Sequence, residues 1–120
     1  MAIDAVTFIP SNRVKLLQRG FNLSQSLATS VAAQLDAPLI HLFTLQHLRD
    51  QRGLNLTQRR QNLRHGLQLD QRQLEKVNDK LSLQHVLVVD DVMTSGATFN
   101  RAAQLLKQNG VKLVGCWALA

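Results

Sequence analysis

Two adjacent acids, Asp90 and Asp91, stand directly before a short loop of small and hydroxyl-bearing residues at 92–98. A helical pattern follows the loop. The first backbone N–H groups of a helix lack intrahelical acceptors and lie at the positive end of the helix dipole, so they can bind a phosphate. Gly96 would let the backbone bend close to the anion. Hydroxyl donors would come from Thr94, Ser95 and Thr98, the last of which is also a candidate helix N-cap.

A phosphate loop alone gains nothing from neighbouring carboxylates. Asp90 and Asp91 fit a ligand that carries a phosphate and, several ångströms away, a pair of sugar hydroxyls, because carboxylates accept hydrogen bonds from a ribose diol. A metal ion can moderate the accumulated negative charge. The alternative is a strand end with two solvated acids and a helix cap. The complete string, set between a buried strand and a helix, favours the ligand site over this alternative.

The elements that must position these residues alternate along the chain. Apolar runs predict strands at 5–10, 37–43, 85–90 and 111–119. A helix with Leu23, Leu27, Val31 and Leu35 on one face is expected after residue 22, and a second helix over 98–109 is expected to end at Gly110. Strands that are nearly continuously apolar favour a parallel sheet with helices on both faces. The fold class is therefore α/β, and residues 1–120 are expected to form a single domain.

Composition narrows the range of functions. Aromatic residues are 4% of the 120 residues and tyrosine is absent, which argues against a base-stacking platform. The lone Cys116 is expected to be a buried, inert thiol. No apolar run is long enough to span a bilayer and no signal sequence opens the chain, so we expect a cytoplasmic protein without membrane insertion.

The segment 49–80 differs in composition and is expected to be an irregular, partly mobile excursion. The net charge of the chain is +6. Such an excess suits nucleic acid or a phosphorylated small molecule equally well. Part of it comes from five arginines with only Asp50 among them: Arg49, Arg52, Arg59, Arg60 and Arg64.

The string "VLVVDDVMTSGAT" closely resembles the phosphoribosyl-pyrophosphate (PRPP) signature of type I phosphoribosyltransferases. Three further strings are similar to segments of the competence protein F (ComF/GntX-like) branch: "RGFN" at 19–22, "QRGL" at 51–54 and "RRQN" at 59–62. The resemblance covers nearly the whole chain. It implies a type I phosphoribosyltransferase core, and nothing in the sequence resembles the hood with which base-using members cover their substrate.

This resemblance also implies roles for individual residues. Asp90 and Asp91 would be the catalytic acids that contact the ribose. The residues expected around the 5-phosphate are Thr94, Ser95, Gly96, Ala97 and Thr98. Arg19 and Gly20 are the candidates for pyrophosphate, and Arg13 is a further one. Arg59 and Asn62 belong to a flap that could close over bound ligand. Mg²⁺ would enter with PRPP and be held through the ligand rather than by a dedicated protein site. The alternative for the arginines is a solvated basic face.

Two functions remain open. The first is a Mg²⁺-dependent phosphoribosyltransferase that transfers the pentosyl group of PRPP, linked to DNA uptake in natural transformation. The second is a catalytically inactive adaptor that binds single-stranded DNA or a competence helicase. A phosphorelay receiver domain also uses paired acids after an apolar strand, but it needs a further phosphoacceptor Asp, and no acid follows Asp91.

Overall fold

The computed structural model describes residues 2–10, 23–45, 66–79, 82–90 and 96–118. Their elements, in chain order, are β1 (Ala5–Phe8), α2 (Leu23–Leu35), β2 (Phe43–Leu45), β3 (Leu67–Leu69), α4 (Gln71–Asn78), β4 (His85–Asp90), α5 (Ala97–Gln108) and β5 (Leu113–Ala118). Within these ranges, none of the helices is both long and apolar enough to cross a lipid bilayer.

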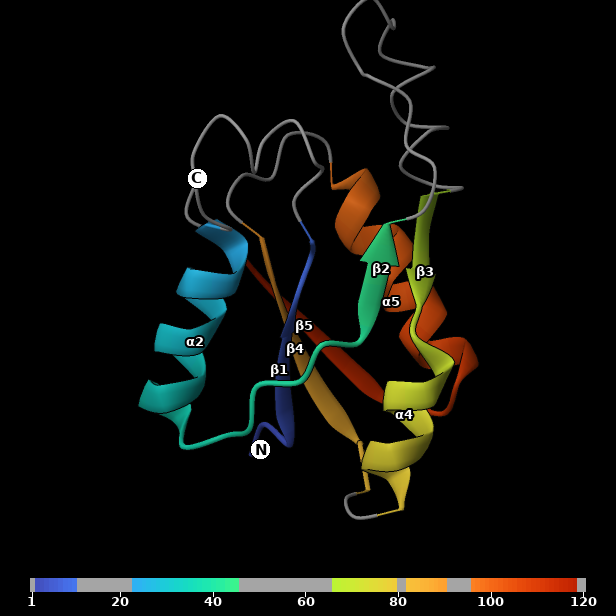
Figure 1. Cartoon of the computed structure of the whole chain (residues 1–120), viewed down its shortest axis with the longest axis horizontal. Helices are drawn as coiled ribbons and strands as arrows, with labels where there is room; N and C mark the ends of the chain where they lie inside the picture. The colour runs from blue at the N-terminus through green and yellow to red at the C-terminus, as the bar shows by residue number, and fades with distance from the viewer. Residues whose placement is uncertain (1, 11–22, 46–65, 80–81, 91–95, 119–120) are drawn as a thin grey trace, which may run out of the picture.

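A parallel sheet in the order β1-β4-β5 forms the centre of the molecule (Figure 1). β4 lies between its two neighbours, with Ala5 opposite Val86 on one side and His85 opposite Leu113 on the other. Leu39 forms an isolated parallel bridge to Val6, so the chain after α2 follows the outer side of β1. The predicted parallel α/β sheet is confirmed, and the boundaries predicted for β4 match the structure.

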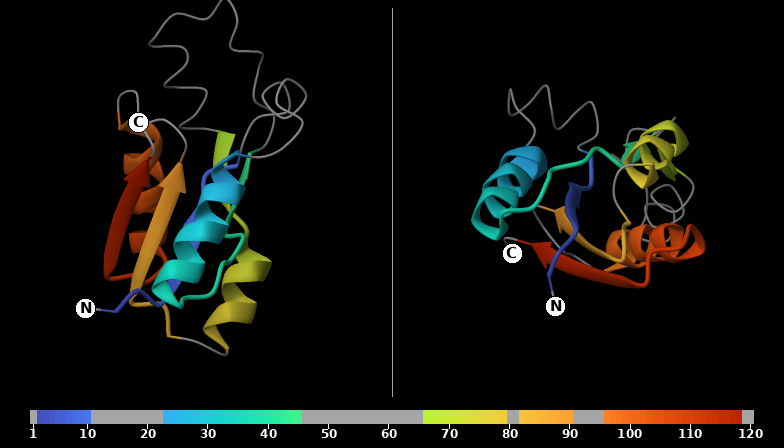
Figure 2. Two further views of the ribbon diagram at one scale, coloured as in Figure 1. Left: turned by 90° about the vertical axis from the view of Figure 1, so that its left-hand side faces the viewer. Right: turned by 90° about the horizontal axis from the view of Figure 1, so that it is seen from below.

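Helices cover both faces of this sheet, as predicted (Figure 2). Alternate residues of a strand point to opposite faces. On one face, Val6, Phe8 and Val89 pack with Ala28 and Ala32 of α2. The other face packs against α5 and forms the larger of the two cores, which contains Val86, Val88, Phe99, Ala102 and Leu106.

The buried face of α2 differs from the prediction by one position. Leu23, Leu27 and Val31 are only half-buried and Leu35 is 46% exposed, whereas the buried residues are Ser24, Ala28 and Ala32. Small side chains let a helix approach a sheet closely, and the leucines then flank the contact instead of filling it. The helix was predicted correctly, but its buried face was not.

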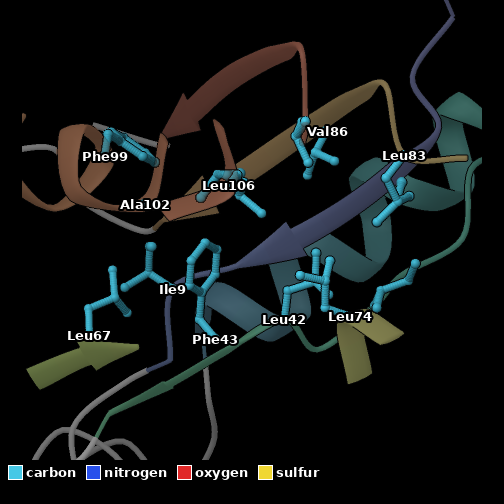
Figure 3. Close-up of a cluster of buried hydrophobic side chains, with 14 residues drawn as sticks. Ile9, Leu42, Phe43, Leu67, Leu74, Leu83, Val86, Phe99, Ala102 and Leu106 are labelled. Atoms are coloured by element: carbon cyan, nitrogen blue, oxygen red, sulfur yellow. The ribbon is translucent and has the colours of Figure 1, made fainter. Parts of the chain in front are cut away.

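Part of the segment 49–80 is regular, which corrects the expectation of an irregular excursion. β3 pairs antiparallel with β2, and α4 follows at once, with Asp70 accepting a hydrogen bond from the backbone N of Gln73 at 3.3 Å as its N-cap. Leu67 and Leu74 are buried in the same core as Leu42 and Phe43 (Figure 3). Residues 46–65, including the predicted flap, lie outside the described ranges.

The C-terminal strand β5 is less covered than its apolar sequence suggests. Leu113 is 41% and Trp117 36% exposed, and Cys116 is an exposed free thiol. The prediction of a buried cysteine is therefore wrong. Desolvation by its surroundings still raises the pKa of this thiol, and the charge of Lys107 opposes that shift in part.

Candidate ligand site at the carboxyl ends of the strands

The predicted site lies at one edge of the sheet. β1 and β4 are parallel and end at the same edge, at Phe8 and Asp90, and α2 and α5 begin there (Figure 1). In open parallel sheets this is the edge at which ligands bind. The structure therefore brings the ends of two strands and the starts of two helices to one place.

Asp90 is the last residue of β4 and is half-buried. Its Oδ1 accepts a hydrogen bond from Oγ of Ser24 at 3.2 Å, across 66 residues of sequence. Ser24 lies in the first turn of α2 and is only 1% exposed. Sequence reasoning missed Ser24. The available signal was that Ser24, Ala28 and Ala32 repeat every four residues. This repeat places a polar side chain in line with two small ones on one face of the helix.

The start of α5 has the features expected of an anion site. Gly96 is its N-cap with φ 75°, a left-handed conformation that favours glycine, and its carbonyl accepts the first helical hydrogen bond from Asn100 N at 2.9 Å. As a glycine, the N-cap residue has no side chain that could accept a hydrogen bond from the first turn of the helix. Helix geometry leaves the N–H groups of Ala97, Thr98 and Phe99 without intrahelical acceptors. These groups can therefore donate hydrogen bonds to a phosphate oxygen.

The predicted role of Thr98 as N-cap is wrong. Thr98 is the second residue of α5 and is half-buried, and Gly96 occupies the cap position. Glycine is accepted at helix N-caps and supplies a positive φ that threonine resists. Of the other residues assigned to the site, Ala97 begins α5. The rest lie outside the described ranges and stay predictions: Arg19, Gly20, Arg59, Asn62, Asp91, Thr94 and Ser95.

A second acid, Asp4, lies at the opposite end of β4 and has a different role. Its Oδ2 accepts hydrogen bonds from the backbone N of Gln84 at 2.9 Å and of His85 at 2.8 Å. These two bonds lower the pKa of the carboxyl group, with a smaller contribution from the charge of His85. Asp4 therefore fixes the start of β4, while Asp90 stands at the end that faces the candidate site.

An open polar hollow of about 400 Å³ also lies at that opposite end, between the last turns of α4 and α5. Its lining includes Asp79, Gln84 and Asn109. It shares no residue with the candidate site.

The site can offer oxygen ligands to a hard cation such as Mg²⁺. The described part of the chain contains no cluster of three or more His, Cys, Asp or Glu side chains that could hold a metal ion. Asp90 supplies a carboxylate of the kind that Mg²⁺ accepts while it keeps waters and phosphate oxygens as its other ligands. Asp90 could therefore contribute one oxygen ligand to such an ion.

Comparisons with known proteins agree with this geometry. A sequence profile described as the phosphoribosyl transferase domain matches residues 20–120. Competence protein F of Haemophilus influenzae is 31% identical over 119 residues, which are 98% of this chain and 50% of that protein. The DNA utilization protein YhgH of Escherichia coli is 30% identical over 125 residues, covering 97% of this chain and 48% of that protein.

Among solved structures, the allosteric regulatory enzyme of purine biosynthesis has a similar fold, with a TM-score of 0.62 at 18% sequence identity. The match covers all of this chain and 22% of that one. The chain spans about half the length of the curated relatives that it matches.

Proposed function

Because this chain belongs to the phosphoribosyl transferase domain family, in its competence protein F branch, we propose that it binds PRPP with Mg²⁺ at the edge formed by Asp90 and the start of α5. The 5-phosphate would lie against the first turn of α5, and the ribose hydroxyls would donate to Asp90 and Asp91. The observation that carries the proposal is the placement of Asp90 at the end of a buried parallel strand, six positions before the glycine N-cap of α5.

The electrostatics of the chain support an anionic ligand. The net charge is +6, and no acid occurs between Val92 and Ala120, so nothing in that part of the sequence repels a phosphate at α5. Arg19 and Gly20 precede α2 in the sequence and are proposed to contact the pyrophosphate. Asn62 and Arg59 are proposed to close over the bound ligand.

If the protein turns PRPP over, the bond between C1 of the ribose and the pyrophosphate oxygen breaks, and the oxygen keeps the electron pair. A bond from C1 to a nucleophile forms, and the nucleophile loses its proton to solvent or to the departing pyrophosphate. When bound, Mg²⁺ would neutralise charge on the leaving group. The carboxylates at residues 90 and 91 would orient the ring through its hydroxyls and stabilise the positive charge that develops on it.

Titration calorimetry with PRPP and Mg²⁺ tests the binding step. The double variant Asp90→Asn/Asp91→Asn should lose most of the affinity, because amide groups replace the charged acceptors of the ribose diol. A matched control is Glu75→Gln/Asp79→Asn, which removes the same charge from two exposed positions at α4. Because the control variant loses negative charge away from the site, its affinity for an anionic ligand should stay the same or rise. A loss of affinity confined to the first double variant therefore supports the proposal, and unchanged affinity there contradicts it.

A second function is favoured by the names of the relatives, which refer to competence and to DNA utilization. We propose that the protein acts in DNA uptake, and that the arginine-rich segment 49–64 contacts single-stranded DNA or a helicase partner. Contacts to phosphates make the logarithm of the affinity fall linearly with the logarithm of the salt concentration. Fluorescence anisotropy with a labelled oligonucleotide should show this slope, and replacing Arg59 and Arg60 should reduce it. No binding at low salt would leave only a protein partner.

A further inference from the structure

We propose that Ser24 is a positioning residue for the ribose end of the site: its hydroxyl holds the Asp90 carboxylate in the orientation that receives the sugar hydroxyls. This inference rests on the proposed function and adds to it a side chain that does not itself touch the ligand. Ser24 Oγ donates to Asp90 Oδ1 at 3.2 Å. At 3.2 Å this bond is long for a hydroxyl donor, so its role is to direct the carboxylate rather than to add much stability.

The position of Ser24 is itself fixed by packing. It is 1% exposed and lies in the first turn of α2, on the same row as Ala28 and Ala32. Those alanines pack against the sheet, so α2 has little freedom to move relative to β4. By contrast, the terminal torsion of an aspartate side chain has a broad preference and is poorly fixed by its own backbone. A donor on a fixed helix therefore favours one orientation of the Asp90 carboxylate.

The hydrogen bond also connects two elements that lie next in sequence to residues proposed to bind the ligand. Ser24 stands just after the segment 11–22, which contains Arg19 and Gly20, and Asp90 stands just before Asp91 and the phosphate loop. The residues proposed for pyrophosphate are thus close in sequence to Ser24, and Asp91 is the sequence neighbour of Asp90. This bond spans 66 residues of sequence and connects the start of α2 to the end of β4.

Calorimetric titration of Ser24→Ala with PRPP and Mg²⁺ tests this role. Alanine fits because the rest of the row is alanine, so the variant should fold with a Tm close to that of the parent. We expect its affinity to fall by about twofold to tenfold, the order of one ordinary hydrogen bond. The matched control is Thr29→Ala on the same helix, which removes an exposed hydroxyl that donates to the Gln25 carbonyl at 2.8 Å. This control should bind as the parent does.

Two conservative variants separate positioning from packing. Ser24→Thr keeps the hydroxyl and should restore affinity. If its extra methyl group does not fit, which a lower Tm would reveal, Ser24→Cys provides the comparison, because it nearly keeps the size and donates only weakly. Ser24→Cys should bind as poorly as Ser24→Ala. Parental affinity in the cysteine variant would mean that the position serves packing alone and would overturn the inference.

A double-mutant cycle identifies the route through Asp90. In an Asp90→Ala background, Ser24→Ala should have no further effect on the affinity measured at high PRPP concentration. An equal loss in both backgrounds would show that Ser24 acts by another route and would overturn the inference. Parental PRPP binding that Ser24→Ala leaves unchanged would overturn this inference alone. No PRPP binding by the parent would overturn the proposed function, and this inference with it.

Discussion

The left-handed backbone of Gly96 leads to a prediction that separates stability from ligand binding. Gly96 has φ 75°, and a Cβ atom at this position would meet nothing within 4 Å. Alanine at this position therefore creates no clash, and its cost comes from the backbone alone. A non-glycine residue in this conformation costs about 1–2 kcal/mol. We expect Gly96→Ala to lower the free energy of unfolding by about this amount, measured by urea denaturation.

Gly110 provides a matched control at the other end of the same helix. It has φ 98°, a Cβ atom there would also meet nothing within 4 Å, and its N–H bonds to the Lys107 carbonyl at 3.2 Å. Gly110→Ala should therefore lower stability by a similar amount, without changing the end of α5 at which phosphate is proposed to bind.

The two variants should differ in affinity. If Gly96→Ala relaxes toward a negative φ, the first N–H groups of α5 turn away from a common point and PRPP affinity falls about fivefold for each 1 kcal/mol of lost interaction. Gly110→Ala should keep the parental affinity. Equal losses of affinity in both variants would mean that binding follows overall stability and would refute the assignment of α5 as the anion site. Unchanged stability of Gly96→Ala would refute the backbone argument.

Two further predictions concern stability. Because the hydrogen bonds to Gln84 and His85 lower the pKa of Asp4, its carboxylate stabilises the fold above its ordinary pKa, and this contribution disappears as the pH falls through the lowered value. Asp4→Ala should therefore reduce the free energy of unfolding at neutral pH and flatten its decline on acidification; a parallel decline in both proteins would contradict this. Leu74→Ala, which empties a 4% exposed core position on α4, should cost about 2–5 kcal/mol in urea denaturation, whereas the exposed Glu75→Ala should stay within about 0.5 kcal/mol. Similar costs for both would show that α4 is not packed on the core.

The sequence was most informative where one physical signal dominated. β4 is a continuous apolar run ended by acids, and the predicted end of α5 at Gly110 matches a glycine with φ 98°. The family was also predictable, because its signature combines strand, loop and helix in one string. β3 and α4 were missed because their apolar residues are sparse: each buries few side chains, and their order depends on the core supplied by distant segments.

The positions in the fold of two proposed site residues were predictable, whereas the contact that supports one of them was not. Asp90 and Gly96 were identified from residue type and spacing. Ser24 was not, because its row with Ala28 and Ala32 can indicate a packed position but not that its partner is an acid 66 residues away. The buried face of α2 was also predicted one position away from the observed one. The leucine spacing points to the largest side chains, whereas the residues that pack closely on the sheet are the smallest.

The antiparallel pair β2–β3 has a consequence for how this molecule tolerates change. Leu45 and Leu67 are partners in the ladder, so the two ends of the connection between β2 and β3 are held side by side. Closing a longer connection between two such anchored points is inexpensive, since doubling its length costs only about 0.6 kcal/mol. Changes in length between these two leucines, such as an inserted tag, should therefore have little effect on the stability of the sheet that carries Asp90.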